Sequence, residues 1–82
     1  MIFVYVLYSQ QFNRLYIGMT NNLDRRLLEH NTGKNKSTKA YLPWVKIHTE
    51  EFEDRLSARK REKYLKTFRG RTLIREKYLL LE

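Results

Sequence analysis

Two short runs of β-branched and aromatic residues stand close together at the start of the sequence. The run IFVYVLYS predicts a strand over residues 2–8, and RLYIGM predicts a second strand over residues 14–19, because such side chains suit a pleated, half-buried surface. Only the polar segment SQQFN separates the two runs. Strands joined by so short a turn pair in antiparallel fashion, so we expect the fold to begin with a β-hairpin.

The register of this hairpin decides which side chains share a face of the sheet. Side chains alternate along a strand, so a turn with an even number of residues, such as residues 9–12, puts Tyr5 opposite Tyr16 on one face. An odd number puts the two tyrosines on opposite faces. We expect the even register, or a bulge equivalent to it. Gly18 then lies on the same face as Tyr16, where its missing side chain leaves a notch.

Further helices and one more strand are expected after the hairpin: helices over residues 22–32, 54–68 and 72–81, and a strand over residues 44–50. Asn21 is the expected N-cap of the first helix, and Gly33 is expected to end that helix. Gly70 is expected to end the second helix. The element order is therefore ββαβαα, and the absence of repeats or linkers predicts a single domain over residues 1–82.

The charge balance indicates a polyanionic partner. The chain has 17 Lys and Arg against 9 Asp and Glu, a net charge of +8, and ten of the cations lie in residues 55–77. Such a field attracts nucleic acid or an anionic membrane surface, although a basic surface without a partner is the plainer alternative. The absence of cysteine excludes disulfides and thiolate metal sites. The first apolar run is too short to span a bilayer, and we expect a cytoplasmic protein without membrane contact.

Two of the predicted helices each carry an unusual polar group on the apolar side. A helical wheel puts His30 on the apolar face of the first helix with Arg26 at its edge, whereas Arg25 points to solvent beside Glu29. In the second helix, Glu62 stands in the middle of the apolar stripe. Because buried charge costs free energy unless it is paired, Arg26 and Glu62 either form a plain salt bridge or belong to a functional site.

These polar groups and the two tyrosines can line one patch, and such a patch suits phosphodiester hydrolysis. The carboxylate of Glu62 can bind a divalent metal through hard oxygen atoms. The guanidinium of Arg26 can bind a phosphate and the charge that develops on it. A tyrosine can orient a water molecule, but it acts as a base at neutral pH only if nearby cations lower its pKa from about 10.

The motifs that carry a family resemblance span nearly the whole chain. They are VYV at residues 4–6, YIG at residues 16–18, and then Arg26, His30 and Glu62. Together they resemble the GIY-YIG nuclease superfamily, and the run KSTKAYLPWVKIHTEEFEDRLSARKREKYLK is similar to the central region of small single-domain bacterial proteins of the UPF0213 type. The resemblance implies an α+β fold in which helices flank a three-stranded antiparallel sheet.

The resemblance also implies DNA as the partner and a site with assigned roles. Arg26 stabilises the phosphate, Tyr5 and Tyr16 lie near the attacking water with Tyr16 preferred as the base, His30 bonds a tyrosine or the phosphate, and Glu62 holds Mg2+ or Mn2+. One departure is Met19, which replaces a lysine of a related excinuclease and removes a cation that would acidify Tyr16. The expected substrate contacts are Gly18, Lys36, Ser37, Thr38, Arg59, Lys60 and Arg61.

Aromatic residues outside this set are expected to be structural. We expect Trp44 in the core or at a strand edge, and Tyr64 and Phe68, four residues apart, beneath the last helix.

The sequence therefore predicts a divalent-metal-dependent endonuclease that cleaves DNA according to its structure, in DNA repair or recombination. A non-catalytic nucleic-acid-binding module that keeps the fold is the first alternative. A protein-interaction domain that uses the acidic segment 50–54 and the basic helix is the second.

Overall fold

The computed structural model describes residues 1–79, which form an α+β fold with the predicted order ββαβαα. The elements are β1 (Ile2–Ser9), β2 (Arg14–Thr20), α1 (Leu23–Asn31), a 3-10 turn η1 (Lys39–Tyr41), β3 (Val45–Phe52), α2 (Arg55–Lys66) and α3 (Phe68–Tyr78). The last predicted helix extended to residue 81, and residues 80–82 lie outside the described part of the chain. Within residues 1–79, no helix has the length and hydropathy needed to cross a membrane.

The three strands form one antiparallel sheet with β1 in the centre, in the order β2-β1-β3. The turn between β1 and β2 spans residues 10–13, so the even register is confirmed. Because this turn is displaced by one residue from the expected one, Tyr5 pairs with Gly18 and Leu7 pairs with Tyr16. The two tyrosines therefore share a face as diagonal neighbours, whereas the prediction that they lie directly opposite each other is wrong.

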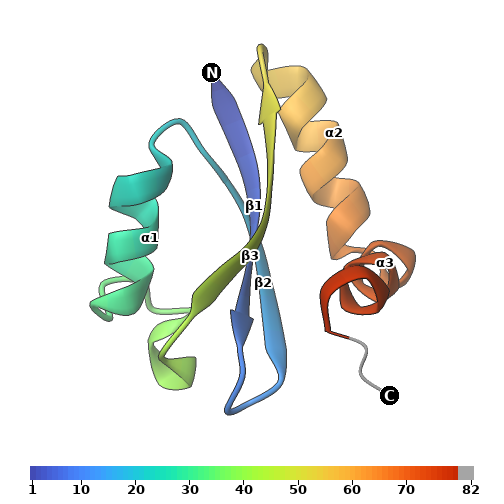
Figure 1. The fold of residues 1–82 in the computed structure, drawn as a ribbon. Helices are drawn as coiled ribbons and strands as arrows, with labels where there is room; N and C mark the ends of the chain where they lie inside the picture. The colour runs from blue at the N-terminus through green and yellow to red at the C-terminus, as the bar shows by residue number, and fades with distance from the viewer. Residues whose placement is uncertain (80–82) are drawn as a thin grey trace.

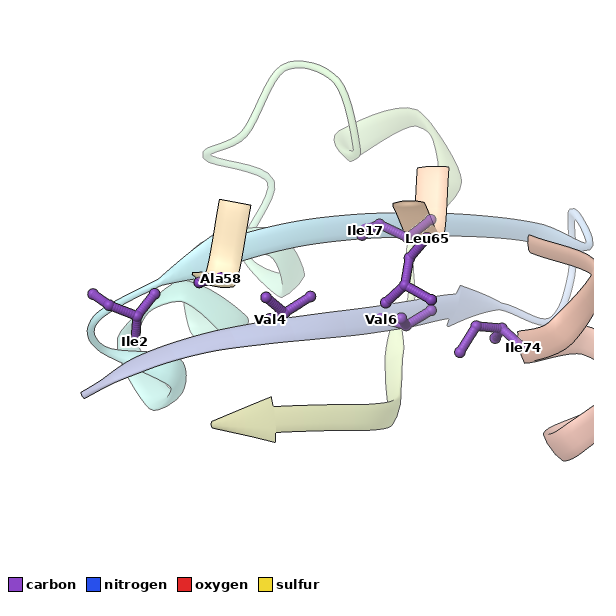
Figure 2. Packing of buried hydrophobic residues seen from close by; sticks show 7 residues of the cluster. All are labelled: Ile2, Val4, Val6, Ile17, Ala58, Leu65 and Ile74. Carbon is purple, nitrogen blue, oxygen red and sulfur yellow. The ribbon is translucent and has the colours of Figure 1, made fainter. Parts of the chain in front are cut away.

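Helices cover both faces of this sheet (Figure 1), with α1 on one side and α2 and α3 on the other. Alternation along β1 supplies both cores. Val4 and Val6 point toward α2 and α3, where they pack with an aliphatic cluster completed by Ile2, Ile17, Ala58, Leu65 and Ile74 (Figure 2). Tyr5 and Leu7 point toward α1 and pack with Tyr16, Leu23, Leu27, Tyr41, Leu42 and Trp44. The first core is aliphatic and the second is largely aromatic.

Local capping explains where the helices begin and end. Asn22, and not the expected Asn21, is the N-cap of α1, since its side chain accepts a hydrogen bond from the Arg25 amide at 3.1 Å. Gly33 follows α1 with a φ of 79°, as expected of a glycine after a helix.

The expectation that Gly70 ends the second helix is wrong. Thr67 ends α2 and also caps α3, because its hydroxyl accepts a hydrogen bond from the Gly70 amide at 3.1 Å. Gly70 lies inside α3, where a Cβ atom would overlap the backbone of Tyr64 and Leu65. This glycine therefore permits α3 to pack closely on the end of α2.

Candidate active site

A chain of buried hydrogen bonds links the centre of the sheet to α1 and the loop that follows it. The Tyr5 hydroxyl lies 2.9 Å from His30 Nε2, and His30 Nδ1 lies 2.9 Å from Thr38 Oγ1. All three side chains are at most 1% exposed. The Thr38 hydroxyl also has the Asn35 carbonyl oxygen within 3.4 Å. If that hydroxyl donates to Asn35, His30 Nδ1–H donates to Thr38 and Nε2 accepts from Tyr5, so every hydrogen has a partner.

The protonation states of this chain follow from its burial. Burial and then the charge of Arg26 lower the pKa of His30, so the imidazole is neutral at physiological pH. Burial, followed by the neighbouring Tyr16, raises the pKa of Tyr5 to about 12, and the Arg26 guanidinium beside it opposes the shift. Tyr5 therefore keeps its proton at neutral pH and is poorly suited to act as a base.

Tyr16 is the more accessible of the two tyrosines. Its ring centroid lies 4.7 Å from that of His30 and 6.3 Å from that of Tyr5, and its side chain is half-buried. Its charge state also influences Arg26, whose pKa is raised first by the hydrogen bond to Glu29 and further by the two tyrosines. Tyr16 and Arg26 are thus neighbours at the surface of a site whose floor is Tyr5 and His30.

The notch at Gly18 is filled by the protein itself. A Cβ atom at this position would overlap the Tyr5 hydroxyl and the ring carbon that bears it. Since β2 is an edge strand, Tyr5 reaches from the central strand across the edge of the sheet at the one residue that leaves room for it. Tyr5 therefore fills the expected notch, and the contact of Gly18 with substrate stays a prediction.

The adjacent arginines of α1 differ as the helical wheel predicts. The Arg25 side chain is 63% exposed and its Nε lies 3.8 Å from Glu29, a surface pair of little energetic value. The Arg26 side chain is 32% exposed and its Nη1 lies 2.9 Å from the same carboxylate. The salt bridge between Arg26 and Glu62, the plain alternative considered above, does not form.

Glu62 belongs to α2 and approaches the site from the other face of the sheet. The expectation that it shares a face with Tyr16 is wrong, because α2 covers the side of the sheet opposite α1 (Figure 1). It is nevertheless close enough for its charge to contribute to the raised pKa of Tyr5. The two residues belong to elements in contact, because α2 packs on both β1 and β2.

Glu62 is a lone, largely buried carboxylate that already has two cationic neighbours. The side chain is 12% exposed, and its oxygen atoms lie 3.6 Å from Arg59 Nε and 3.3 Å from Lys66 Nζ. Among residues 1–79, no group of three or more His, Asp or Glu side chains gathers as a metal cage. Mg2+ is commonly held by one or two carboxylates together with water and substrate phosphates, so Glu62 alone is compatible with such an ion.

The other predicted substrate contacts separate into two groups. Thr38 is buried against His30, and its expected contact with phosphate is wrong, because its hydroxyl has no access to solvent. Lys36 and Ser37 are exposed on the same loop, where Ser37 bonds the Asn35 side chain at 2.6 Å. Their role as substrate contacts stays a prediction.

The basic run of α2 divides in the same way. Arg61 donates from Nε to both oxygens of Glu50, at 2.9 and 3.1 Å, and so fastens α2 to β3. The substrate contact expected of Arg61 stays a prediction, and it would require Arg61 to leave this ion pair. Arg59 faces Glu62, whereas Lys60 is exposed and has no ion pair among the described residues. Lys60 is therefore the best placed of the three to meet a phosphate.

A further contact of the loop was not foreseen from the sequence. Asn31 at the end of α1 bonds both the amide and the carbonyl of Trp44, at 2.8 and 3.0 Å. The indole nitrogen of Trp44 in turn donates to the Thr38 carbonyl at 2.9 Å, and Trp44 is 4% exposed, in the core as expected. These bonds hold the loop that carries Thr38 against His30.

Comparison with known proteins agrees with this architecture. The family model described as the GIY-YIG catalytic domain matches residues 1–78. A UPF0213 protein of Staphylococcus haemolyticus is 39% identical over 67 residues, which cover 80% of each chain. A UPF0213 protein of Bacillus velezensis is 42% identical over 76 residues, which cover 92% of this chain and 71% of that protein.

A solved structure gives the same result for the fold. The solution NMR structure of a UPF0213 protein from Bacillus halodurans superposes with a TM-score of 0.55 and 28% identity, covering 90% of this chain and 82% of that one. The match to the family model spans the tyrosine motifs on β1 and β2, Arg26 and His30 on α1, and Glu62 on α2. The chain belongs to the GIY-YIG nuclease family.

Proposed function

We propose that this chain is a divalent-metal-dependent DNA endonuclease. The observation that carries the proposal is the packing of Tyr16 against His30, which is bonded to the buried Tyr5 and lies one helical turn from Arg26 on α1. Membership of the GIY-YIG family and the net charge of +8 support DNA as the substrate. We place its action in the cytoplasm, on branched or flapped DNA in repair or recombination.

Each side chain has a role that its surroundings suit. Tyr16, accessible and beside a cation, binds the attacking water and takes its proton. Arg26 leaves its surface pair with Glu29 to bind the phosphate and meet the charge that develops on it. Tyr5 and His30, both held by hydrogen bonds, keep the floor of the site rigid. Glu62 would hold the divalent ion, which when bound stabilises negative charge on the phosphate oxygens.

One observation favours a binding module without catalysis. Arg26 is already paired with Glu29, and Glu62 lies between Arg59 and Lys66. A protein that only binds DNA needs no rearrangement of these pairs, whereas catalysis requires both groups to exchange a protein partner for substrate or metal.

Cleavage of labelled DNA separates the two functions. The protein is incubated with branched, flapped and plain duplex DNA, each with Mg2+, with Mn2+ and with a chelator. We expect cleavage that needs the metal and is faster on branched or flapped DNA than on plain duplex. Binding of all three without cleavage in either metal would overturn the proposal in favour of the binding module.

A further inference from the structure

The helices on the side of the sheet away from α1 carry the charge of the whole protein. Residues 55–78 contain ten Lys and Arg against two Glu, a net charge of +8. The rest of the chain therefore has equal numbers of cations and carboxylates. A polyanion will be drawn more strongly to α2 and α3 than to α1.

Aromatic side chains lie exposed on this basic surface. Phe68 is 85% exposed and Tyr64 is 39% exposed, so the prediction that they pack beneath the last helix is wrong. With Leu73, which is 42% exposed, they border a groove of about 220 Å³ whose other lining residues are Arg69, Thr72 and Glu76. These three apolar side chains line one groove and so form a contiguous exposed patch rimmed by polar residues, which is typical of an interaction surface.

The groove is distinct from the candidate active site. Tyr64 follows Glu62 by two positions, which places it about 200° around the helix. Its ring lies on the flank of α2 where the Arg61 guanidinium sits 5.4 Å from the ring centroid. Arg59 and Lys66 lie instead beside Glu62. A DNA strand that reaches both the groove and the candidate active site must therefore pass over α2.

We propose that this groove binds an unpaired base of DNA, with the base stacked on Phe68 and its flanking phosphates held by the cations of α2 and α3. The inference rests on the proposed function only in taking DNA as the partner. Stacking on an exposed aromatic ring combined with a basic surface is the usual way in which proteins hold unstacked strands.

The polar residues of the groove favour a base over a lipid or an acidic peptide. The carboxylate of Glu76 repels a phosphate headgroup or an acidic side chain placed in the groove, whereas it can accept a hydrogen bond from the amino group of a base. The Thr72 hydroxyl can donate or accept. Arg69, on the same rim, is available to a phosphate next to the base.

Binding measured without cleavage tests the proposal. The probe is an oligonucleotide duplex with a single-stranded flap that carries 2-aminopurine, whose fluorescence is quenched by stacking, and all solutions contain a chelator. We expect Phe68→Ala to weaken flap binding by roughly five- to a hundredfold and to remove the fluorescence change. We expect blunt duplex binding to stay the same, and Phe68→Trp to restore the flap preference.

Leu56 provides the matched control. It is 69% exposed on the first turn of α2, on the same side of the sheet as Phe68 but outside the groove, so Leu56→Ala should leave flap binding and fluorescence unchanged. The proposal is overturned if Phe68→Ala weakens flap and duplex equally, if it changes neither, or if it abolishes binding to anionic phospholipid vesicles while flap binding persists. Because no metal is present, the result is independent of cleavage: a protein that cuts nothing can still show the Phe68 effect, and an active nuclease can lack it.

Discussion

The two faces of the sheet share the central strand β1 but carry different kinds of core. Toward α1, the side chains of β1 meet aromatic rings and a chain of buried polar groups, Tyr5, His30 and Thr38. Toward α2 and α3, they meet a core that is aliphatic except for Met19 and Phe52 at its border, and the helices on this side carry ten cations. The first arrangement fixes a few groups in defined protonation states, whereas the second provides a stable support for a strongly charged surface.

This difference explains how so short a chain separates chemistry from binding. Buried polar groups must be satisfied, and no buried side-chain nitrogen or oxygen in the described residues lacks a partner. The excess of positive charge lies on the other side of the sheet, in α2 and α3. Glu62 is the exception, a carboxylate on the basic side whose charge reaches Tyr5.

Replacing Glu62 should have the largest effect on cleavage, because this residue of the basic side is the proposed metal ligand of the site on the other side of the sheet. Glu62→Gln keeps the shape but removes the anionic oxygen that a hard cation needs, so we expect metal-dependent cleavage to disappear. Cleavage rates of both proteins, measured across a titration of Mg2+, check this. Wild-type rates in the variant would show that the carboxylate holds no catalytic ion.

Arg26→Ala should come next. Loss of a preorganised donor to developing charge typically costs about 2.7–4 kcal/mol, so we expect a hundred- to thousandfold slower cleavage. Arg25→Ala, which alters the exposed neighbour on the same helix, should change the rate very little. Single-turnover kinetics of the two variants, with thermal unfolding as a check on folding, measure the contrast. Equal losses in both would contradict the inward role of Arg26.

Gly18→Ala tests the fit between Tyr5 and the edge strand. The new methyl group would overlap the Tyr5 hydroxyl. Moving that hydroxyl aside would weaken its hydrogen bond to His30. We expect the free energy of unfolding to fall by about 1–3 kcal/mol, as for other overpacked sites. Urea denaturation of the wild type and the variant measures this difference in the free energy of unfolding. An unaltered midpoint would mean that Tyr5 has room to shift.

The smallest effect concerns pH. Because burial lowers the pKa of His30 in the folded protein, the unfolded chain binds the proton more readily. The stability from the neutral imidazole is complete above the ordinary histidine pKa of about 6.5 and is lost as the pH falls toward the lowered value. Urea denaturation at pH values on both sides of about 6.5 should show this loss, and His30→Gln should reduce it. A pH dependence identical in the two proteins would contradict burial of a neutral His30.

The sequence was sufficient for the parts of this account that depend on local periodicity. Alternation along β1 and β2, combined with the expected even turn, places Tyr5 and Tyr16 on one face, and the helical wheel separates Arg25 from Arg26. A wheel shows that Glu62 is buried, but it cannot show which face of the sheet α2 covers, and that choice set Glu62 apart from the tyrosines. The sequence pattern also could not predict that the turn between β1 and β2 is displaced by one residue.

Loop contacts had no periodic signal at all. In the sequence, Thr38 is an ordinary loop residue. In the structure, hydrogen bonds from Asn31 to Trp44 and from Trp44 to Thr38 hold it against His30. Phe68 was misread for a related reason: its spacing from Tyr64 matches a helix face, whereas α2 ends between them at Thr67.

Separation of cleavage from binding tests the central claim most directly. DNA affinity is measured with a chelator at several salt concentrations, and the cleavage rate is measured with Mg2+ at saturating protein, for Arg26→Ala and for the double variant Lys60→Gln, Lys63→Gln. We predict that Arg26→Ala loses cleavage but keeps most of the affinity, and that its salt slope falls by no more than about 0.9, the share of one phosphate contact. The double variant should keep the rate at saturation, bind more weakly, and lose about 0.9 from the salt slope for each phosphate contact removed. If both variants lose affinity and cleavage rate together, cleavage and binding do not depend on different faces of the sheet, and the account is contradicted.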